Sequence, residues 1–209
     1  MLEGYEYIDD RWYRTYLEDV EIAKKEIQDM KLYPKKGILG ELYALPSHNF
    51  QTYYAIVYED DGKMKMVYAK SQIHIWHFSE PINMYTFKEA KEASHHPAYA
   101  GKIIVGLKRL NDDFGGLITD VFKSIPKSHF LEERGLRIDG VLQAIKVFED
   151  GKEIKSVIYS DADEMELPGD KGYLHDELRE LYLTVGAFIG KSDEKIKIID
   201  SKEKSHGRY

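Results

Sequence analysis

Five residues of this sequence carry the side chains that acid–base and metal chemistry need: His95, His96, Asp112, Asp113 and His129. Imidazole nitrogens titrate near neutral pH and bind transition metals, and carboxylates serve as bases or as metal ligands. If the fold brings these side chains to one point, they could form the site of a small hydrolase or another metal-assisted enzyme. They come from separate stretches of chain, so only the fold can decide whether they meet.

Four of these residues also have an ordinary structural explanation. His95 and His96 follow a predicted helix, whose C-terminal end favours a positive charge. Asp112 and Asp113 belong to the run Asn111-Asp-Asp-Phe-Gly-Gly116, which predicts a turn with a capping Asn or Asp and glycines at positive φ. The spacings His-x-x-x-His and His-Glu-x-x-His are missing. The sequence therefore predicts no metal or cofactor, and it leaves open whether the chain is an enzyme.

The stretch Gly186-Ala-Phe-Ile-Gly190-Lys-Ser resembles a phosphate-binding loop in composition. It has three residues between its glycines where the motif needs four, and it lies at the end of a predicted helix. A phosphate loop must instead lead into a helix, because the N-terminal amides bind the phosphate. We therefore reject this stretch as a nucleotide site.

Four carboxylates fall within the six residues Asp161-Ala-Asp-Glu-Met-Glu166, directly after a predicted strand. A calcium loop would need an oxygen ligand where Met165 stands and a glycine where Glu166 stands, so that explanation fails. A run of this kind is commonly a solvated loop. Its functional alternative is electrostatic: Asp161, Asp163, Glu164 and Glu166 would dock into a basic cleft on another protein.

Tyrosine is unusually frequent, with 16 residues, of which 12 precede residue 100. Tyrosine is common at recognition surfaces, but it is also an ordinary strand former. In the stretch Tyr53–Tyr58, alternation predicts aromatic side chains on both faces of a strand. Such a strand should be covered on both sides, so we expect most of these rings to belong to the core.

Periodicity predicts the helices that must position these residues. Over Arg11–Lys31, apolar side chains recur every three or four residues, which indicates one face packed on a core. Thr86 and Glu89 have capping-box spacing and predict a short helix over Thr86–Ser94. A last helix is expected over Leu174–Ile189, and Leu117–Ile125 is compatible with a short one.

Between the helices the apolar period changes to two, which is typical of strands. Two Asp-Gly turns, at residues 61–62 and 150–151, predict β-hairpins. The chain is therefore predicted to be α+β, with a mainly antiparallel sheet built from two hairpins plus single strands, and with N-terminal and C-terminal amphipathic helices packed on it. We expect one domain over residues 1–200, with a possible subdomain division near 95–111, and a flexible polar tail over 201–209. The expected strands are Ile38–Leu45, Phe50–Glu59, Lys63–Phe78, Gly101–Leu110, Arg137–Phe148, Glu153–Ser160 and Lys195–Asp200.

Composition excludes several classes of protein. The absence of cysteine excludes disulfide scaffolds, thiolate metal sites and cysteine nucleophiles. A net charge of −7 has the wrong sign for wrapping nucleic acid. The acidic, glycine-broken start differs from a secretory signal, and the most apolar window is too short to span a membrane, so a cytoplasmic location is expected.

Three functional hypotheses remain. The first is an acidic protein-binding module, such as an immunity-type protein or inhibitor that blocks a basic nuclease or a similar toxin. The alternative is the hydrolase or metal-assisted enzyme built from the His and Asp residues above. A third is a small-ligand carrier with a cavity enclosed by a curved sheet, which periodicity cannot distinguish from a filled core. The oligomeric state is left open by the sequence.

Overall fold

The computed structural model describes residues 10–46, 52–75, 86–88, 91, 99–125, 130–132, 141–161, 172–190 and 197–199. Its helices are α1 (Asp10–Asp29), α3 (Asp112–Ser124) and α4 (Gly172–Gly190). Its strands are β1 (Ile38–Pro46), β2 (Tyr53–Asp60), β3 (Lys63–Ile75), β4 (Tyr99–Arg109), β5 (Phe130–Glu132), β6 (Val141–Glu149), β7 (Lys152–Asp161) and β8 (Lys197–Ile199). The predicted helix Thr86–Ser94 is described only at residues 86–88 and 91, and the predicted tail 201–209 lies outside the described residues.

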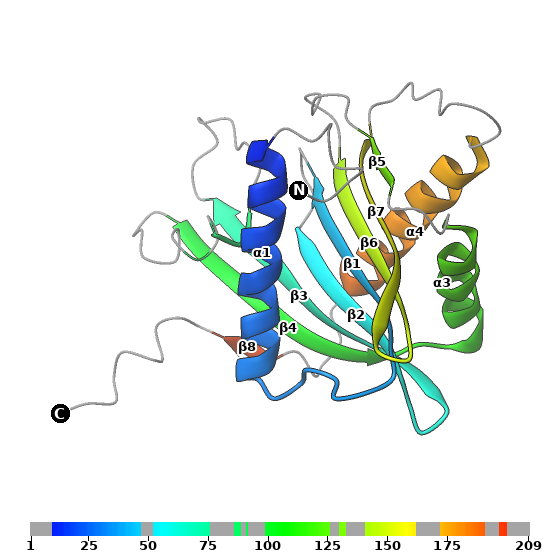
Figure 1. Ribbon diagram of the computed structural model, residues 1–209. Coiled ribbons are helices and arrows are strands. Elements are labelled where there is room, and N and C mark those ends of the chain that lie inside the picture. Colours follow the sequence, from blue (N-terminus) through cyan, green and yellow to red (C-terminus); the bar gives the residue numbers. More distant parts are fainter. Residues whose placement is uncertain are drawn as a thin grey trace.

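The strands form a single sheet with the order β5-β7-β6-β1-β2-β3-β4-β8. All neighbouring strands pair antiparallel except β5 and β7, which pair parallel. Figure 1 shows α1 on one face of this sheet and α3 and α4 on the other. The α+β class and the mainly antiparallel sheet are therefore confirmed.

Both Asp-Gly turns connect neighbouring antiparallel strands. Asp61 and Gly62 have φ values of 51° and 68° between β2 and β3, and Asp150 and Gly151 have 51° and 76° between β6 and β7. Two successive positive φ angles match the right-handed twist of the paired strands, which is why Asp-Gly is favoured in such turns. The sheet order places β1 between the two hairpins.

One stripe of α1 packs on the sheet, as the periodicity predicts. Tyr16, Val20, Ala23 and Ile27 are buried and belong to a cluster that includes Tyr43 and other residues of the central strands. Side chains of β2 alternate between this cluster and the one beneath α3 and α4. The prediction that β2 is covered on both faces is therefore confirmed, and its tyrosines belong to the core.

The prediction of a turn over Asn111–Gly116 is wrong, because helix α3 begins at Asp112. Asn111 caps it, with its side-chain oxygen accepting a hydrogen bond from the amide of Phe114 at 2.9 Å. Gly115 lies inside the helix, where a Cβ atom would come within 2.8 Å of Met64 Sδ. Glycine lets the helix lie close to the Met64 side chain of β3, and it has no positive φ here.

Two buried lysines of the sheet hold the C-terminal end of α4. Lys70 Nζ donates to the carbonyl of Ile189 at 3.0 Å, and Lys108 Nζ donates to that of Phe188 at 2.6 Å. Ammonium groups suit the negative end of a helix dipole and satisfy its last carbonyls. Burial and the neighbouring Lys108 charge lower the pKa of Lys70.

Gly186–Gly190, which begins the stretch that resembles a phosphate-binding loop, lies at this C-terminal end of α4, as predicted. None of the helices in the described part of the chain is long and apolar enough to cross a membrane.

Candidate functional site

The structure tests only part of the predicted His and Asp site. Asp112 and Asp113 are exposed in the first turn of α3, where carboxylates interact favourably with the positive end of the helix dipole. His95, His96 and His129 lie outside the described residues. Within the described ranges, no group of three or more His, Asp or Glu side chains is arranged to hold a metal ion.

The predicted acidic contact begins where β7 ends. Asp161 is the last residue of that strand and pairs with Val141 of β6. Asp163, Glu164 and Glu166 lie outside the described residues. Their role in binding therefore stays a prediction.

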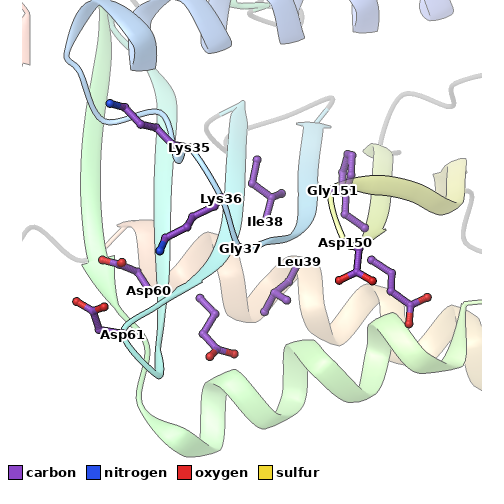
Figure 2. A pocket seen from close by; sticks show the side chains of 12 residues that line it. Lys35, Lys36, Gly37, Ile38, Leu39, Asp60, Asp61, Asp150 and Gly151 are labelled. Carbon is purple, nitrogen blue, oxygen red and sulfur yellow. The ribbon is translucent and has the colours of Figure 1, made fainter.

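The structure has a hollow between the two hairpin turns, and this hollow is the candidate functional site. We call the turn Asp60–Gly62 the first tip and the turn Glu149–Gly151 the second tip. The hollow has a volume of about 700 Å³ and opens between these tips, over the residues that lead into β1 (Figure 2). Its lining comprises Lys35, Lys36, Gly37, Ile38, Leu39, Glu59, Asp60, Asp61, Phe148, Glu149, Asp150 and Gly151.

Gly37 fixes the chain between the tips. It has a φ of 71°, and its carbonyl accepts a hydrogen bond from the amide of Glu59 at 2.8 Å. A Cβ atom at this position would lie 2.2 Å from the carbonyl oxygen of Glu59. The start of β1 therefore lies against the end of β2 with no room for a side chain, and this contact forms part of the wall of the hollow.

Carboxylates dominate the lining, with five against two lysines. Asp60 forms a 2.6 Å ion pair with Lys65, which lies beyond the lining. This hydrogen-bonded pair lowers the pKa of Asp60, with a smaller contribution from Lys36, whose side chain extends towards Asp60 in Figure 2. The other four carboxylates have no ion-pair partner among the described residues. They are Glu59 near the end of β2, Asp61 in the first tip, and Glu149 and Asp150 in the second tip.

Three of the side chains that line the hollow are apolar. Ile38, Leu39 and Phe148 line the hollow and are each only partly buried. Ile38 and Leu39 pack against opposite core clusters, and in Figure 2 their side chains point to opposite sides of the strand, so each contributes its own apolar contact to the hollow.

No family model, curated protein or solved structure matches this chain. Its function must therefore be argued from its own residues.

The chemistry available in the hollow is electrostatic attraction of cations combined with apolar contact. The described residues that line it include no histidine, serine, threonine or tyrosine, so they supply neither an imidazole base nor a hydroxyl nucleophile. Its exposed carboxylates would attract ammonium or guanidinium groups and accept their hydrogen bonds. This arrangement suits binding.

Sequence reasoning identified both tips as turns and did not identify the hollow. Each tip carries an acidic residue before its Asp-Gly pair, Asp60 in one and Glu149 in the other, but this pattern is common in solvent-exposed hairpins. Only the sheet order, with β1 between the two hairpins, brings the two tips to the same end of the sheet. The acidic residue that precedes each Asp-Gly pair was the one feature of the sequence that could have pointed to the hollow.

The ion pair at the first tip gives a pH-dependent prediction. Because the pKa of Asp60 is lowered in the folded state, its contribution to stability is present above the unfolded pKa and is lost as pH falls through the folded pKa. Urea unfolding of the native protein and of Asp60→Asn should therefore show a stability difference at neutral pH that disappears in strong acid. In a Lys65→Met background most of this pH dependence should be lost, because only the smaller contribution of Lys36 remains. A stability difference between the native protein and Asp60→Asn that stays constant down to acidic pH would contradict the prediction.

Proposed function

We propose that this protein is a binding module that recognises a protein partner with a basic surface, and that the hollow between the hairpin tips is its contact site. A concrete version is an immunity-type protein or inhibitor that covers the basic active surface of a nuclease or a similar toxin. In this proposal the protein acts in the cytoplasm. The partner is defined by its chemistry, which is positive charge displayed around an apolar contact.

The observation that carries this proposal is that four carboxylates around one hollow have no ion-pair partner within the part of the chain that the structure describes. Glu59 and Asp61 belong to the first hairpin, far in the sequence from Glu149 and Asp150 in the second, yet the two hairpins flank the start of β1. The overall charge of −7 adds a long-range attraction for a basic partner. Charge of this kind speeds association and excludes partners of the same sign.

The tips are held in place by the sheet beneath them. The β2–β3 pairing continues to Asp60 and Lys63, and the β6–β7 pairing continues to Glu149 and Lys152. Because each turn spans only the residues between these pairs, little conformational freedom is left to lose on binding. Preorganisation of this kind favours affinity by reducing the entropy cost of association.

The acidic run at Asp161–Glu166 is a second candidate contact in the same proposal. It begins at the end of β7 opposite to the second tip, and β7 has ten residues. At about 3.3 Å per residue, the two ends lie about 30 Å apart. Substitutions at the two places should therefore be distinguishable in one binding assay.

The proposal is tested by affinity capture from extracts of the cells that encode the protein, at low salt. The native chain is compared with a hollow variant in which Glu59→Gln, Asp61→Asn, Glu149→Gln and Asp150→Asn remove four charges. Asparagine tolerates a positive φ well, so the turns should keep their conformation. We expect the native chain to retain a basic protein that the hollow variant releases, and we expect high salt to weaken the retention.

A matched control removes four charges at exposed positions away from the hollow, namely Glu21→Gln, Asp29→Asn, Asp113→Asn and Glu180→Gln. It should retain the partner as the native chain does. A further variant, Asp163→Asn with Glu164→Gln and Glu166→Gln, tests the acidic run. Loss of the partner only in this last variant would overturn the assignment to the hollow. Retention of no basic protein by the native chain would overturn the proposed function.

A further inference from the structure

We propose that Met64 is an oxidation-sensitive contact, at which conversion of its thioether to a sulfoxide by a peroxide loosens helix α3 from the sheet. Met64 lies near the start of β3, and α3 packs on the face of the sheet to which its side chain belongs. The proposal concerns how the helix layer is held, so it goes beyond the proposed function and does not depend on it.

Methionine supplies all the sulfur of this chain, which has six methionines and no cysteine. The structure describes the side chains of three of them, Met30, Met64 and Met66. Met66 is completely buried in the core, whereas Met64 is partly exposed. Because an oxidant must reach the sulfur, Met64 should react well before Met66.

The sulfur of Met64 lies against the face of α3 that packs on the sheet. An ideal Cβ at Gly115 would be only 2.8 Å from Met64 Sδ, so the helix comes this close because position 115 has no side chain. Thr119, one turn further along α3, has its hydroxyl 4.0 Å from the same sulfur. Met64 also packs against the core cluster that contains Phe114 and Ile118. The sulfur is therefore part of the contact between helix and sheet.

The proposed reaction transfers one oxygen atom to this sulfur. The sulfur lone pair attacks one oxygen of the peroxide, and the O–O bond breaks. The transferred oxygen gives up its proton to the departing one, which leaves as water when the oxidant is hydrogen peroxide. The sulfur is oxidised by two electrons and the peroxide is reduced by two. Methionine sulfoxide reductases reverse the change, so the site can act as a switch.

The added oxygen is a strong hydrogen-bond acceptor, and the nearby donors on α3 are already used. The hydroxyl of Thr119 donates to the carbonyl of Gly115 at 2.8 Å. The amide of Gly115 donates to the carbonyl of Asn111 at 2.9 Å. A polar group buried without a partner is costly, and a close-packed contact has no space for an extra atom. The sulfoxide oxygen therefore favours an arrangement in which α3 moves away from β3 and water enters.

The experiment treats the full-length protein with dilute hydrogen peroxide and follows each methionine by peptide mass spectrometry. We expect sulfoxide to form at Met64 well before Met66. Urea unfolding should then give an unfolding equilibrium constant about tenfold larger for the oxidised protein. Hydrogen exchange should accelerate in the amides of α3 more than in those of α1. Treatment with methionine sulfoxide reductase should restore both properties.

Three variants separate Met64 from the other methionines. Met64→Leu keeps a similar apolar volume without an oxidisable sulfur, so peroxide should leave its stability and its α3 exchange unchanged. Met30→Leu retains Met64 and should respond to peroxide as the native chain does. Met64→Gln places a polar group at the same position, and it should show the faster exchange of α3 without any peroxide.

Equal loss of stability in Met64→Leu and in the native chain would assign the effect to another methionine and overturn the proposal. Formation of sulfoxide at Met64 without faster exchange in α3 would also overturn it. Neither measurement uses a binding partner, so the outcome is separate from that of the capture experiment.

Discussion

Gly37→Ala is expected to lower the free energy of unfolding by about 3 kcal/mol, because a left-handed backbone angle and a steric clash act together. Gly37 has a φ of 71°, and its added Cβ would lie 2.2 Å from the carbonyl oxygen of Glu59. That oxygen belongs to backbone and cannot rotate away. Relief of the clash would separate the start of β1 from β2 and break the hydrogen bond from the Glu59 amide.

The clash can be separated from the backbone effect with two other glycines. Gly62 and Gly151 also have positive φ values, of 68° and 76°, but an added Cβ would meet no atom within 4 Å. Alanine at either position should therefore cost only about 1 kcal/mol, the penalty of the left-handed conformation itself. Urea unfolding of all three variants provides the measurement. Equal losses in the three would contradict the steric argument.

The same comparison bears on the hollow. Gly37→Ala should also reduce binding of a basic partner, because it displaces the strand that lies between the tips. The alanine variants of Gly62 and Gly151 change the tips without touching this strand. Binding that survives in Gly37→Ala would show that the wall at the start of β1 is not part of the contact.

Much of the fold could be predicted because it depends on local pattern. The Asp-Gly pairs specify tight turns, and the alternation in Tyr53–Tyr58 specifies a strand covered on both faces. The stripe of apolar residues in α1 likewise predicts a helix that packs on the sheet. Each of these signals lies within a short stretch of chain, so it can be recognised in the sequence without knowledge of the tertiary structure.

Pairings between distant strands could not be predicted in the same way. The neighbours of β1 are β2 and β6, and β6 lies almost a hundred residues further along the chain. Strand β5 has only three residues and pairs parallel with β7, which leaves no periodic signal. The hollow depends on the first of these pairings, because β1 separates the two hairpins. A site made in this way has no motif of its own.

The misassigned turn at Asn111–Gly116 has a different cause. Two adjacent glycines are unfavourable within a helix, so local propensity favours a turn. In the fold, Gly115 allows α3 to approach Met64 closely, and the packing of Phe114, Ile118 and Phe122 outweighs the propensity. Asn111 caps the helix as its residue type predicts. Tertiary contacts therefore make the helix begin earlier in the chain than local propensity predicts, whereas the cap at Asn111 follows from its residue type.

Asp19→Ala is expected to lower the free energy of unfolding by about 3 kcal/mol, because it removes a buried carboxylate that accepts hydrogen bonds from two other segments of the chain. Asp19 is fully buried on α1. Its Oδ2 accepts a bond from the hydroxyl of Tyr43 on β1 at 2.9 Å, and its Oδ1 accepts one from the amide of Lys88 at 3.3 Å. The carboxylate thus joins α1 both to the sheet and to the segment that carries Lys88.

A nearby carboxylate supplies the control. Glu18 is the neighbour of Asp19 on α1 and forms a 3.0 Å ion pair with the side chain of Lys88, with both side chains more than half exposed. Exposed pairs contribute little, so Glu18→Ala should change stability by less than about 0.5 kcal/mol. Chemical denaturation measures both variants, and hydrogen exchange of the amides in α1 and β1 shows whether the loss is local. If the two variants lost equal stability, burial would not explain the role of Asp19, and its link between helix and sheet would be no stronger than a surface contact.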